Sequence, residues 1–364
     1  MKTRTRFRLL VVRLGAMGDI LHALPAITAL RQQHPEWVID WVVEPRWSAL
    51  LAASDSEGRC TSCSFLKPDP RQPLVDNLIL AATKEWRKKL FSRKTLGAVR
   101  DLRGELQAGD YDATLDMQGA IRSSIVSKFA GSRTIIGAAE PRERPAKLLY
   151  TDFVRTHGEH VIEQAVELAM SIAGDELEPV RPILPVDSAA EAWAEALLAR
   201  KTDAAAGLIL INPGAGWGAK RWPVERYAEV SQHFASKGYR ILINIGPGEE
   251  ALAEAIQEQA GPAAIPLNCT LAQLIAVSRR IDLAIAGDTG PLHLACALGK
   301  PVVGIYGPTD PGRNGPYGTH FRVLRSPESK RDHTRRADPE AGLLTIQPAA
   351  VVQAAEELLY AEKV

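Results

Sequence analysis

Short apolar runs alternate with segments of helical apolar spacing in both halves of this 364-residue chain. No other feature restricts the fold as strongly, because strands that alternate with helices indicate a parallel sheet with helices on both faces. The sequence therefore predicts an α/β protein with two doubly wound, Rossmann-like domains that face each other across a cleft. Strands are expected at 7–13, 38–43, 111–116, 134–137, 207–211, 239–245, near 264, at 281–286, after 300 and at 321–324, and the clearest helices at 20–30, 161–173, 224–236, 249–259, 271–278 and 348–360.

The stretch from Glu178 to Asp187 separates the two halves, because it holds three prolines and has no regular periodicity. The predicted boundaries are an N-terminal domain at 1–178, a linker at 179–187 and a C-terminal domain at 188–346. The remaining segment, 347–364, contains a helix that we expect to pack back onto the N-terminal domain.

The charge of the chain is balanced, with 44 Lys and Arg against 43 Asp and Glu and a net charge of +1. This balance gives no reason to expect a nucleic-acid partner. Between Lys84 and Arg103, however, eight basic residues stand against two acidic ones. The segment is predicted to be helical and interrupted near Gly97. It is either a solvated helix face or a surface that meets an anionic partner.

Cysteine usage and the N-terminus predict a reduced, cytosolic and metal-free protein. Cys60 and Cys63 have CxxC spacing, but no second Cys/His pair lies at zinc-finger distance, so no structural zinc is expected. Cys269 and Cys296 are expected to be buried thiols. The N-terminal apolar run is interrupted by Arg13 and does not resemble a signal peptide, and no run of about 18 apolar residues predicts a membrane span.

The stretch 287–295 (GDTGPLHLA) follows an apolar strand and precedes a segment of helical composition. A strand that breaks at a glycine and restarts as a helix leaves unpaired N–H groups at the carboxyl edge of a sheet, where anions bind. Asp288 and Thr289 suit the N-cap, and Pro291 suits the first turn. The stretch is predicted to be a phosphate pocket, although many α/β proteins have such turns without a ligand.

Two further turns of the second half have a composition suited to a nucleotide. The loop 213–223 (PGAGWGAKRWP) combines small residues, which let backbone amides approach an anion, with the ammonium of Lys220. The alternative is that Lys220 is an ordinary surface lysine. The turn at 246–250 carries Glu249 and Glu250, which either accept hydrogen bonds from ribose hydroxyls or only favour the helix dipole.

Asp19 is the most useful chemical group of the first strand–helix turn, Leu14–Asp19. The two glycines of this turn do not have the spacing of a phosphate-binding motif. The carboxylate is therefore interpreted either as a helix cap or as a catalytic group.

Taken together, five motifs resemble the ADP-heptose:lipopolysaccharide heptosyltransferase family of GT-B glycosyltransferases, over nearly the whole chain. They are 17–22 (MGDILH) with 24–26 (LPA), the loop 213–223, 288–293 (DTGPLH) and 306–311 (YGPTDP). Four other stretches look most like heptosyltransferase I of that family: 40–44 (DWVVE), 86–88 (WRK), 116–119 (DMQG) and 142–143 (RE).

The resemblance implies an inverting transfer of L-glycero-D-manno-heptose from ADP-heptose to a Kdo residue of Kdo-lipid A in the lipopolysaccharide inner core. It implies that Asp19 is the general base. No cofactor is expected, because a helix N-terminus and Lys220 can supply the positive field around the departing diphosphate without a metal, and no DxD motif demands one; the sequence does not decide a role for Mg2+. The implied donor-binding residues are Lys220, Glu249, Glu250, Asp288, Thr289, Gly290 and His293. The implied acceptor-binding residues are Arg87, Lys88, Lys89, Gln118, Arg122 and Arg142.

The lipid acceptor implies peripheral association with the anionic cytoplasmic face of the inner membrane, and closure of the domains over the donor is also expected. The segment 326–343 matches no pattern and is expected to be a mobile loop. Three alternatives remain: a later-acting heptosyltransferase, a nucleotide-sugar epimerase built from two similar domains, and a binding protein without turnover.

Overall fold

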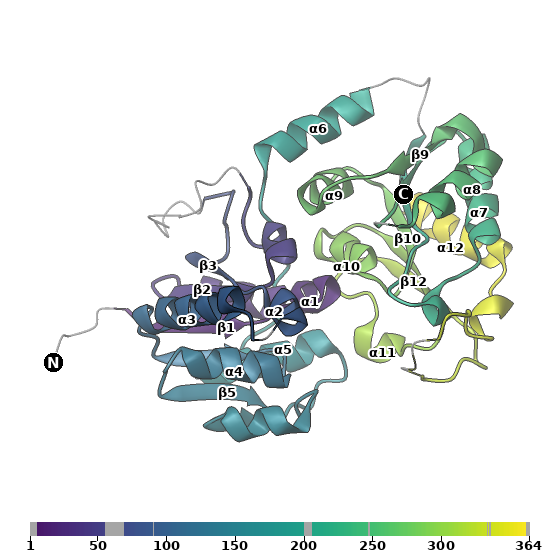
Figure 1. Cartoon of the computed structure of the whole chain (residues 1–364). Coiled ribbons are helices and arrows are strands. Elements are labelled where there is room, and N and C mark those ends of the chain that lie inside the picture. Colours follow the sequence, from purple (N-terminus) through teal and green to yellow (C-terminus); the bar gives the residue numbers. More distant parts are fainter. Residues whose placement is uncertain are drawn as a thin grey trace. The chain divides into compact units, whose positions relative to one another are not determined.

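The computed structural model describes residues 6–54, 69–89, 91–199, 206–246, 248–332, 334 and 336–361. The chain divides into two compact units, Met1–Asp187 and Ser188–Val364 (Figure 1). Each unit is built around one six-stranded parallel sheet with helices. The predicted pair of doubly wound α/β domains is thus confirmed.

The first sheet has the strand order β3-β2-β1-β4-β5-β6, and all five strand pairs are parallel. The outermost strand β6, with three residues, is the shortest described strand of this unit. Its elements are β1 Arg8–Val12, α1 Met17–Gln33, β2 Val38–Val43, η1 Pro45–Leu50, β3 Asn77–Leu80, α2 Thr83–Lys88, α3 Arg93–Ala108, β4 Ala113–Asp116, α4 Ile121–Phe129, β5 Thr134–Ala138, η2 Arg144–Leu149, β6 Asp152–Val154 and α5 Val161–Ala173.

Helices cover both faces of the first sheet, because successive residues of a strand point to opposite sides. Leu10 and Val12 of β1 pack with Leu102 and Leu106 of α3 and with Val126 of α4. The alternate residues of β1 are also fully buried, and α5, which packs along α1, contacts β4, β5 and β6. One layer is therefore formed by α3 and α4 and the other by α1 and α5.

The basic segment differs from its prediction as one helix interrupted near Gly97. The interruption lies between α2 and α3, and Gly97 is inside α3. The side chain of Ser92 accepts a hydrogen bond from the backbone N–H of Thr95 at 3.1 Å. This N-cap begins a new helix at Arg93, and a cap outweighs the modest cost of one glycine in the interior.

The predicted linker, 179–187, lies in the first unit and is fastened to it. The backbone N–H of Val180 donates to the carbonyl of Pro25 (3.4 Å), and that of Val186 donates to the carbonyl of Pro70 (2.8 Å). The side chain of Asp187 accepts from the backbone N–H of Ser54 at 3.0 Å. The division between the units therefore falls after Asp187.

The second sheet has the order β12-β11-β10-β7-β8-β9, again with parallel pairs throughout. Its elements are α6 Ser188–Ala199, β7 Gly207–Asn212, η3 Gly218–Lys220, α7 Val224–Ser236, β8 Tyr239–Asn244, α8 Glu250–Ala260, η4 Gly261–Ala263, β9 Ala264–Leu267, α9 Leu271–Ser278, β10 Leu283–Gly287, α10 Gly290–Ala297, β11 Val302–Tyr306, α11 Pro311–Asn314, β12 Phe321–Arg325, η5 Leu343–Thr345 and α12 Pro348–Ala361.

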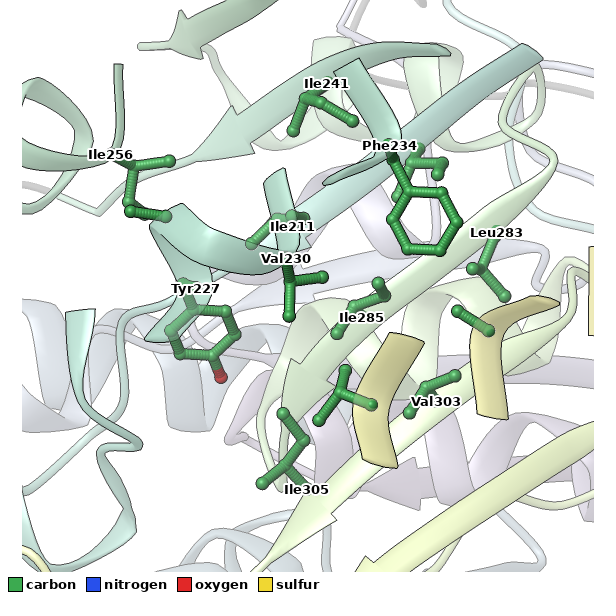
Figure 2. Packing of buried hydrophobic residues seen from close by; sticks show 14 of the residues in the cluster. Ile211, Tyr227, Val230, Phe234, Ile241, Ile256, Leu283, Ile285, Val303 and Ile305 are labelled. Carbon is green, nitrogen blue, oxygen red and sulfur yellow. The ribbon is translucent and has the colours of Figure 1, made fainter. Parts of the chain in front are cut away.

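The core of the second unit lies between the sheet and α7, α8 and α12 (Figure 2). Phe234 of α7 packs edge-on against Tyr239 of β8 with ring centroids 5.7 Å apart. Val351, Ala355 and Leu358 of α12 belong to this same core. The apolar face of α12 is buried against α7, β11 and β12, so this helix belongs to the second unit. The expectation that it also packs onto the N-terminal domain stays a prediction.

Candidate active site

The topological switch point of the second sheet lies between β7 and β10, because the chain order runs outward in opposite directions from these two neighbours. Open α/β sheets bind ligands beyond the carboxyl ends of their strands at such a point. The loop 213–223 leaves β7, and the stretch 288–290 leaves β10. Both phosphate-binding candidates therefore lie together at the place where the topology favours a ligand.

Lys220 is joined to Asp288 at this switch point. Its ammonium forms an ion pair with the Asp288 carboxylate and donates to the backbone carbonyl of Asp288 at 3.2 Å. Nζ also lies 4.4 Å from the centre of the Trp217 ring. The Lys220 side chain is only 11% exposed. The alternative of an ordinary surface lysine is thus excluded.

Asp288 also contacts His293, whose Nε2 lies 3.1 Å from the second carboxylate oxygen. Burial raises the pKa of Asp288, but the hydrogen bond and charge of His293, together with Lys220, outweigh it and hold the pKa well below its usual range. The ionised carboxylate fixes both side chains at the start of α10, of which Gly290 is the first residue. A helix start with fixed positive groups suits an anion.

Two buried asparagines that sequence reasoning did not single out complete this switch point. Asn244 donates to the side-chain oxygen of Asn212 at 2.6 Å, and Asn212 donates to the hydroxyl of Thr289 at 3.3 Å. Asn212 also donates to the carbonyl of Gly214 at 2.9 Å. Each asparagine is the last residue of its strand and directly follows an apolar run. A polar residue at that position was the available signal.

The two glutamates of the turn after β8 differ in their surroundings. Glu249 is half-buried and accepts from the backbone N–H of Gly246 at 2.9 Å. A Cβ added at Gly214 would lie 2.1 Å from the Glu249 carboxylate, so the loop after β7 passes directly over it. Glu250 is exposed and accepts only a 3.3 Å bond from Gly248 among the described contacts. The geometry thus favours Glu249 as the ligand-binding carboxylate.

Asp19 lies at the switch point of the first sheet, between β1 and β4. One carboxylate oxygen accepts from the backbone N–H of Ala16 (2.9 Å), and the other lies 3.2 Å from Nη2 of Arg13. The bond from Ala16 caps the N-terminus of α1, which agrees with the interpretation of Asp19 as a capping residue. The side chain is nevertheless 37% exposed, and each carboxylate oxygen can accept another hydrogen. A base role is compatible with this geometry and stays a prediction.

Gln118 and Arg142 lie on segments that meet beside β4. The Gln118 side-chain oxygen accepts from the backbone N–H of Leu14 at 2.9 Å and so ties the two switch-point loops together. The N–H of Glu143 donates to the carbonyl of Gly119 at 2.9 Å, which places the exposed Arg142 next to this loop. Gln118 therefore has a structural role in addition to the predicted contact with an acceptor.

Fully buried Asp116 holds the same loop and was missed as a site-shaping residue. It accepts from the backbone N–H groups of Gln118 (2.9 Å) and Gly119 (3.1 Å) and from the hydroxyls of Ser123 and Tyr150 (both 2.9 Å). Burial raises the pKa of Asp116 despite these donors. The DMQG motif contained the signal, since its aspartate ends a buried strand.

Arg87 and Lys88 end α2, and Lys89 follows; all three are exposed. Several positively charged side chains lie close enough to the neighbouring Lys84 to affect its titration. Its pKa is lowered by burial first and then by the positive charges of Arg46 and Arg122, with a smaller effect from Arg87. The predicted residues Arg87 and Arg122 therefore both lie near Lys84. Arg46 was not predicted from the sequence, because it does not belong to a run of basic residues.

Residues 99–343 match the glycosyltransferase family 9 (heptosyltransferase) profile. The chain belongs to this family. Lipopolysaccharide heptosyltransferase 1 of Escherichia coli K12 is 32% identical over 326 residues, which cover 88% of this chain and 94% of the relative. The Pseudomonas aeruginosa protein of the same name is 27% identical over 323 residues, or 85% of this chain and 81% of the relative.

Solved structures agree with this assignment. The E. coli heptosyltransferase WaaC with ADP has a TM-score of 0.76 and 28% identity, covering 97% of this chain and all of WaaC. The same protein with ADP-2-deoxy-2-fluoro heptose has a TM-score of 0.73. This family 9 enzyme is therefore a GT-B glycosyltransferase, and transfer is favoured over epimerisation or binding alone.

The segment 326–343 of this family 9 enzyme was expected to be a mobile loop, but its described residues form a strap against the donor-side loops. The N–H of Ala219 donates to the carbonyl of Arg336, and the N–H of Glu340 donates to the carbonyl of Ala219, both at 3.2 Å. The N–H of Asp332 donates to the carbonyl of Pro308 at 3.0 Å. The strap thus fastens the loop after β7 and the turn after β11.

Gly218 shows how closely the strap packs. A Cβ at this position would lie 1.5 Å from the carbonyl oxygen of Ala337, whereas one at Gly216 in the same loop would meet nothing within 4 Å. Glu340 secures the strap from inside, since its carboxylate accepts from the Ser329 hydroxyl and the Leu343 N–H, both at 2.9 Å. The position of Lys220 therefore depends on a segment more than 100 residues further along the chain.

Among the described residues, no helix is long and apolar enough to cross a membrane, and no three His, Cys, Asp or Glu side chains are grouped to hold a metal. Cys296 is buried and Cys269 is partly buried, and burial raises their pKa values to about 12 and about 11. Cys60 and Cys63 lie outside the described residues. The absence of a metal requirement stays a prediction.

Proposed function

We propose that this family 9 enzyme transfers L-glycero-D-manno-heptose from ADP-heptose to a Kdo residue of Kdo-lipid A with inversion. Binding of the donor is supported mainly by one observation, the buried Lys220–Asp288–His293 group at the start of α10. It offers fixed positive charge where negative charge develops on a departing diphosphate. The relatives named lipopolysaccharide heptosyltransferase 1 support the substrate class.

Asp288 takes an orienting role in this proposal. An ionised carboxylate repels a diphosphate, but it keeps Lys220 and His293 in place before the donor arrives. Its remaining lone pairs suit the hydroxyl groups of the donor sugar. Thr289, held by Asn212, and the N–H groups of α10 then contact phosphate oxygens, and Glu249 accepts from the ribose hydroxyls.

The acceptor half of the proposal depends on the cations of the first unit. Kdo carries a carboxylate, and lipid A carries phosphates. Arg87 and Arg122, which are electrostatically coupled to Lys84, form a suitable counter-charge, and exposed Arg142 adds to it. Lys88 and Lys89 lie beside Arg87 on the same short helix and its cap. Exposed cations bind such groups in a salt-dependent way.

In the proposed reaction, Asp19 removes the proton from the acceptor hydroxyl as its oxygen bonds to the anomeric carbon of the heptose. The bond from that carbon to the β-phosphate breaks on the opposite face, and its electron pair leaves with ADP. Lys220 and the start of α10 stabilise the developing charge, so the proposal requires no metal or cofactor.

The test is ADP release from ADP-heptose with and without Kdo-lipid A. We expect release that depends on the acceptor and falls by roughly 10²-fold or more in Asp19→Asn, with ADP affinity unchanged. Acceptor-independent release, or full activity of Asp19→Asn, would contradict the proposal. Asp101→Asn, which removes an exposed carboxylate in α3, is the control.

A later-acting heptosyltransferase is the second candidate, because lipooligosaccharide heptosyltransferase 2 of Haemophilus influenzae is 24% identical over 96% of this chain. Competition between Kdo-lipid A and heptosyl-Kdo-lipid A separates the two. Preference for the already heptosylated acceptor would favour this candidate. Either acceptor is anchored in a bilayer, so we also propose peripheral association with an anionic membrane surface.

A further inference from the structure

The two helical layers of the first unit carry opposite charge. α3 packs against α4 (Figure 1). α4 contacts η2, and α2 joins the same apolar cluster through Trp86. These four elements contain eleven Lys and Arg against three Asp and Glu. On the other face, α1 and α5 contain one basic and three acidic residues. Positive charge is therefore concentrated on one side of the sheet.

Exposed apolar side chains gather on that same side. Phe91, between α2 and α3, is 92% exposed, and Leu148 of η2 is 85% exposed. Leu96 of α3 and Ile121 and Ile125 of α4 are each more than two-fifths exposed. Among the described residues of α1 and α5, no large hydrophobic side chain is exposed in this way. Apolar groups within a cationic surface indicate an interaction site.

We propose that the surface of α2, Phe91, α3, α4 and η2, called the basic layer, docks on an anionic lipid bilayer. Phe91 and Leu148 enter the interfacial region of the bilayer, and the surrounding cations remain at the level of the headgroups. Opposite charge supplies long-range attraction, and the apolar side chains supply short-range affinity. The inference rests on the proposed function only in that a lipid-anchored acceptor gives the docking a purpose.

The chemistry of the basic layer favours a bilayer over other anionic partners. A nucleic acid would be met mainly by cations and would leave Phe91 and Leu148 without an apolar contact, although aromatic stacking on bases is possible for Phe91 alone. Leu148 has no such alternative. The acidic residues of the layer neutralise little of its positive charge, because they are few. The Arg100–Asp101 pair of α3 is 3.5 Å long and largely exposed.

Flotation of the full chain with vesicles tests the proposal. We expect binding to vesicles of phosphatidylethanolamine with phosphatidylglycerol, weak binding to phosphatidylcholine alone, and loss of binding in about 0.5 M NaCl. Phe91→Ser combined with Leu148→Ser lowers partitioning by about tenfold or more. Arg100→Glu combined with Arg103→Glu lowers it by a similar factor. Ile183→Ser is the matched control, because Ile183 is 64% exposed but lies outside the basic layer.

Equal binding by the parent and both double variants would overturn the proposal, as would an equal loss in Ile183→Ser. Tighter binding to single-stranded DNA than to the anionic vesicles would assign the layer to a different partner. ADP release with a deacylated, water-soluble Kdo acceptor should be unchanged in all of these variants. If the parent lacks that activity but binds vesicles, the proposed function fails while the docking surface stands.

Discussion

The two switch points share one strand order but differ in chemistry. At the first, between β1 and β4, the partly open carboxylate of Asp19 lies 3.2 Å from the mostly buried guanidinium of Arg13, and the predicted acceptor-binding residues Arg87 and Arg142 are exposed. At the second, between β7 and β10, Lys220, Asp288 and His293 are buried and bonded to one another. The same topology thus fixes where a site forms, and the side chains alone decide what it does.

The difference predicts how each site responds to its surroundings. Buried, mutually bonded groups are already oriented and are screened little by salt, which suits the stabilisation of a transition state. Exposed cations are screened readily and adapt to a large acceptor. The most direct test of this difference is to remove a charge from one switch point and to measure whether the affinity for the donor or for the acceptor falls.

The largest effect is expected from Lys220→Met. Turnover should fall by about 10²- to 10³-fold, because the diphosphate loses its fixed counter-charge, and the affinity for ADP should fall with it. Steady-state kinetics and calorimetric ADP titration measure both. Lys237→Met is the control, since Lys237 pairs with Glu356 on the surface of the same unit. Unchanged ADP affinity in Lys220→Met would show that the second switch point does not hold the donor phosphates.

Asp288→Asn tests the buried switch point through the pH dependence of the unfolding free energy. A carboxyl whose pKa is lowered by folding stabilises the protein above its unfolded pKa of about 3.9, and this stability is lost as the pH falls through the folded value. The parent should exceed the variant by roughly 2 kcal/mol in unfolding free energy at pH 5–7. Below about pH 4 the difference should shrink.

Urea unfolding at a series of pH values measures this difference. The exposed carboxyl of Asp101 supplies the comparison, since Asp101→Asn should remain close to the parent throughout. A gap between the parent and Asp288→Asn that widens toward low pH would have the wrong sign and would refute the ion-pair explanation.

The smallest effect is expected from Gly218→Ala, which tests the strap. The added Cβ collides with the backbone of Ala337, so the loop carrying Lys220 must shift. The KM for ADP-heptose should rise by about tenfold, with a loss of about 1 kcal/mol in unfolding free energy. Gly216→Ala, in open space, should change stability by less than about 0.5 kcal/mol. Equal KM values for the two variants would show that the strap does not position Lys220.

The sequence was most informative where a buried element is long and apolar. The helices α5, α7 and α9 begin and end as predicted. The missed strands β3 and β6 are edge strands of four and three residues with exposed side chains, so neither is long enough to show a clear pattern. The missed helix α6 buries mainly Ala190 and Ala194, which are too small to give a clear periodicity.

For the site, the sequence identified the residues at strand ends but not the partners brought to them by the fold. Lys220 and Asp288 are 68 residues apart, so their ion pair depends on the order of strands that no local pattern contains. Arg46 and the strap were missed for the same reason. Asn212 and Asn244 could have been identified from the sequence, because Asn212 directly follows the strand predicted at 207–211 and Asn244 lies near the end of the strand predicted at 239–245.

The place of α12 has a consequence for the order in which the protein forms during synthesis. Unit 1 is one continuous stretch of chain and can fold as soon as residue 187 has left the ribosome. Unit 2 must wait for Val351, Ala355 and Leu358 to fill its core. Until then, the part of its apolar sheet face that α12 covers stays exposed to solvent, and we expect the nascent chain to be prone to aggregation there.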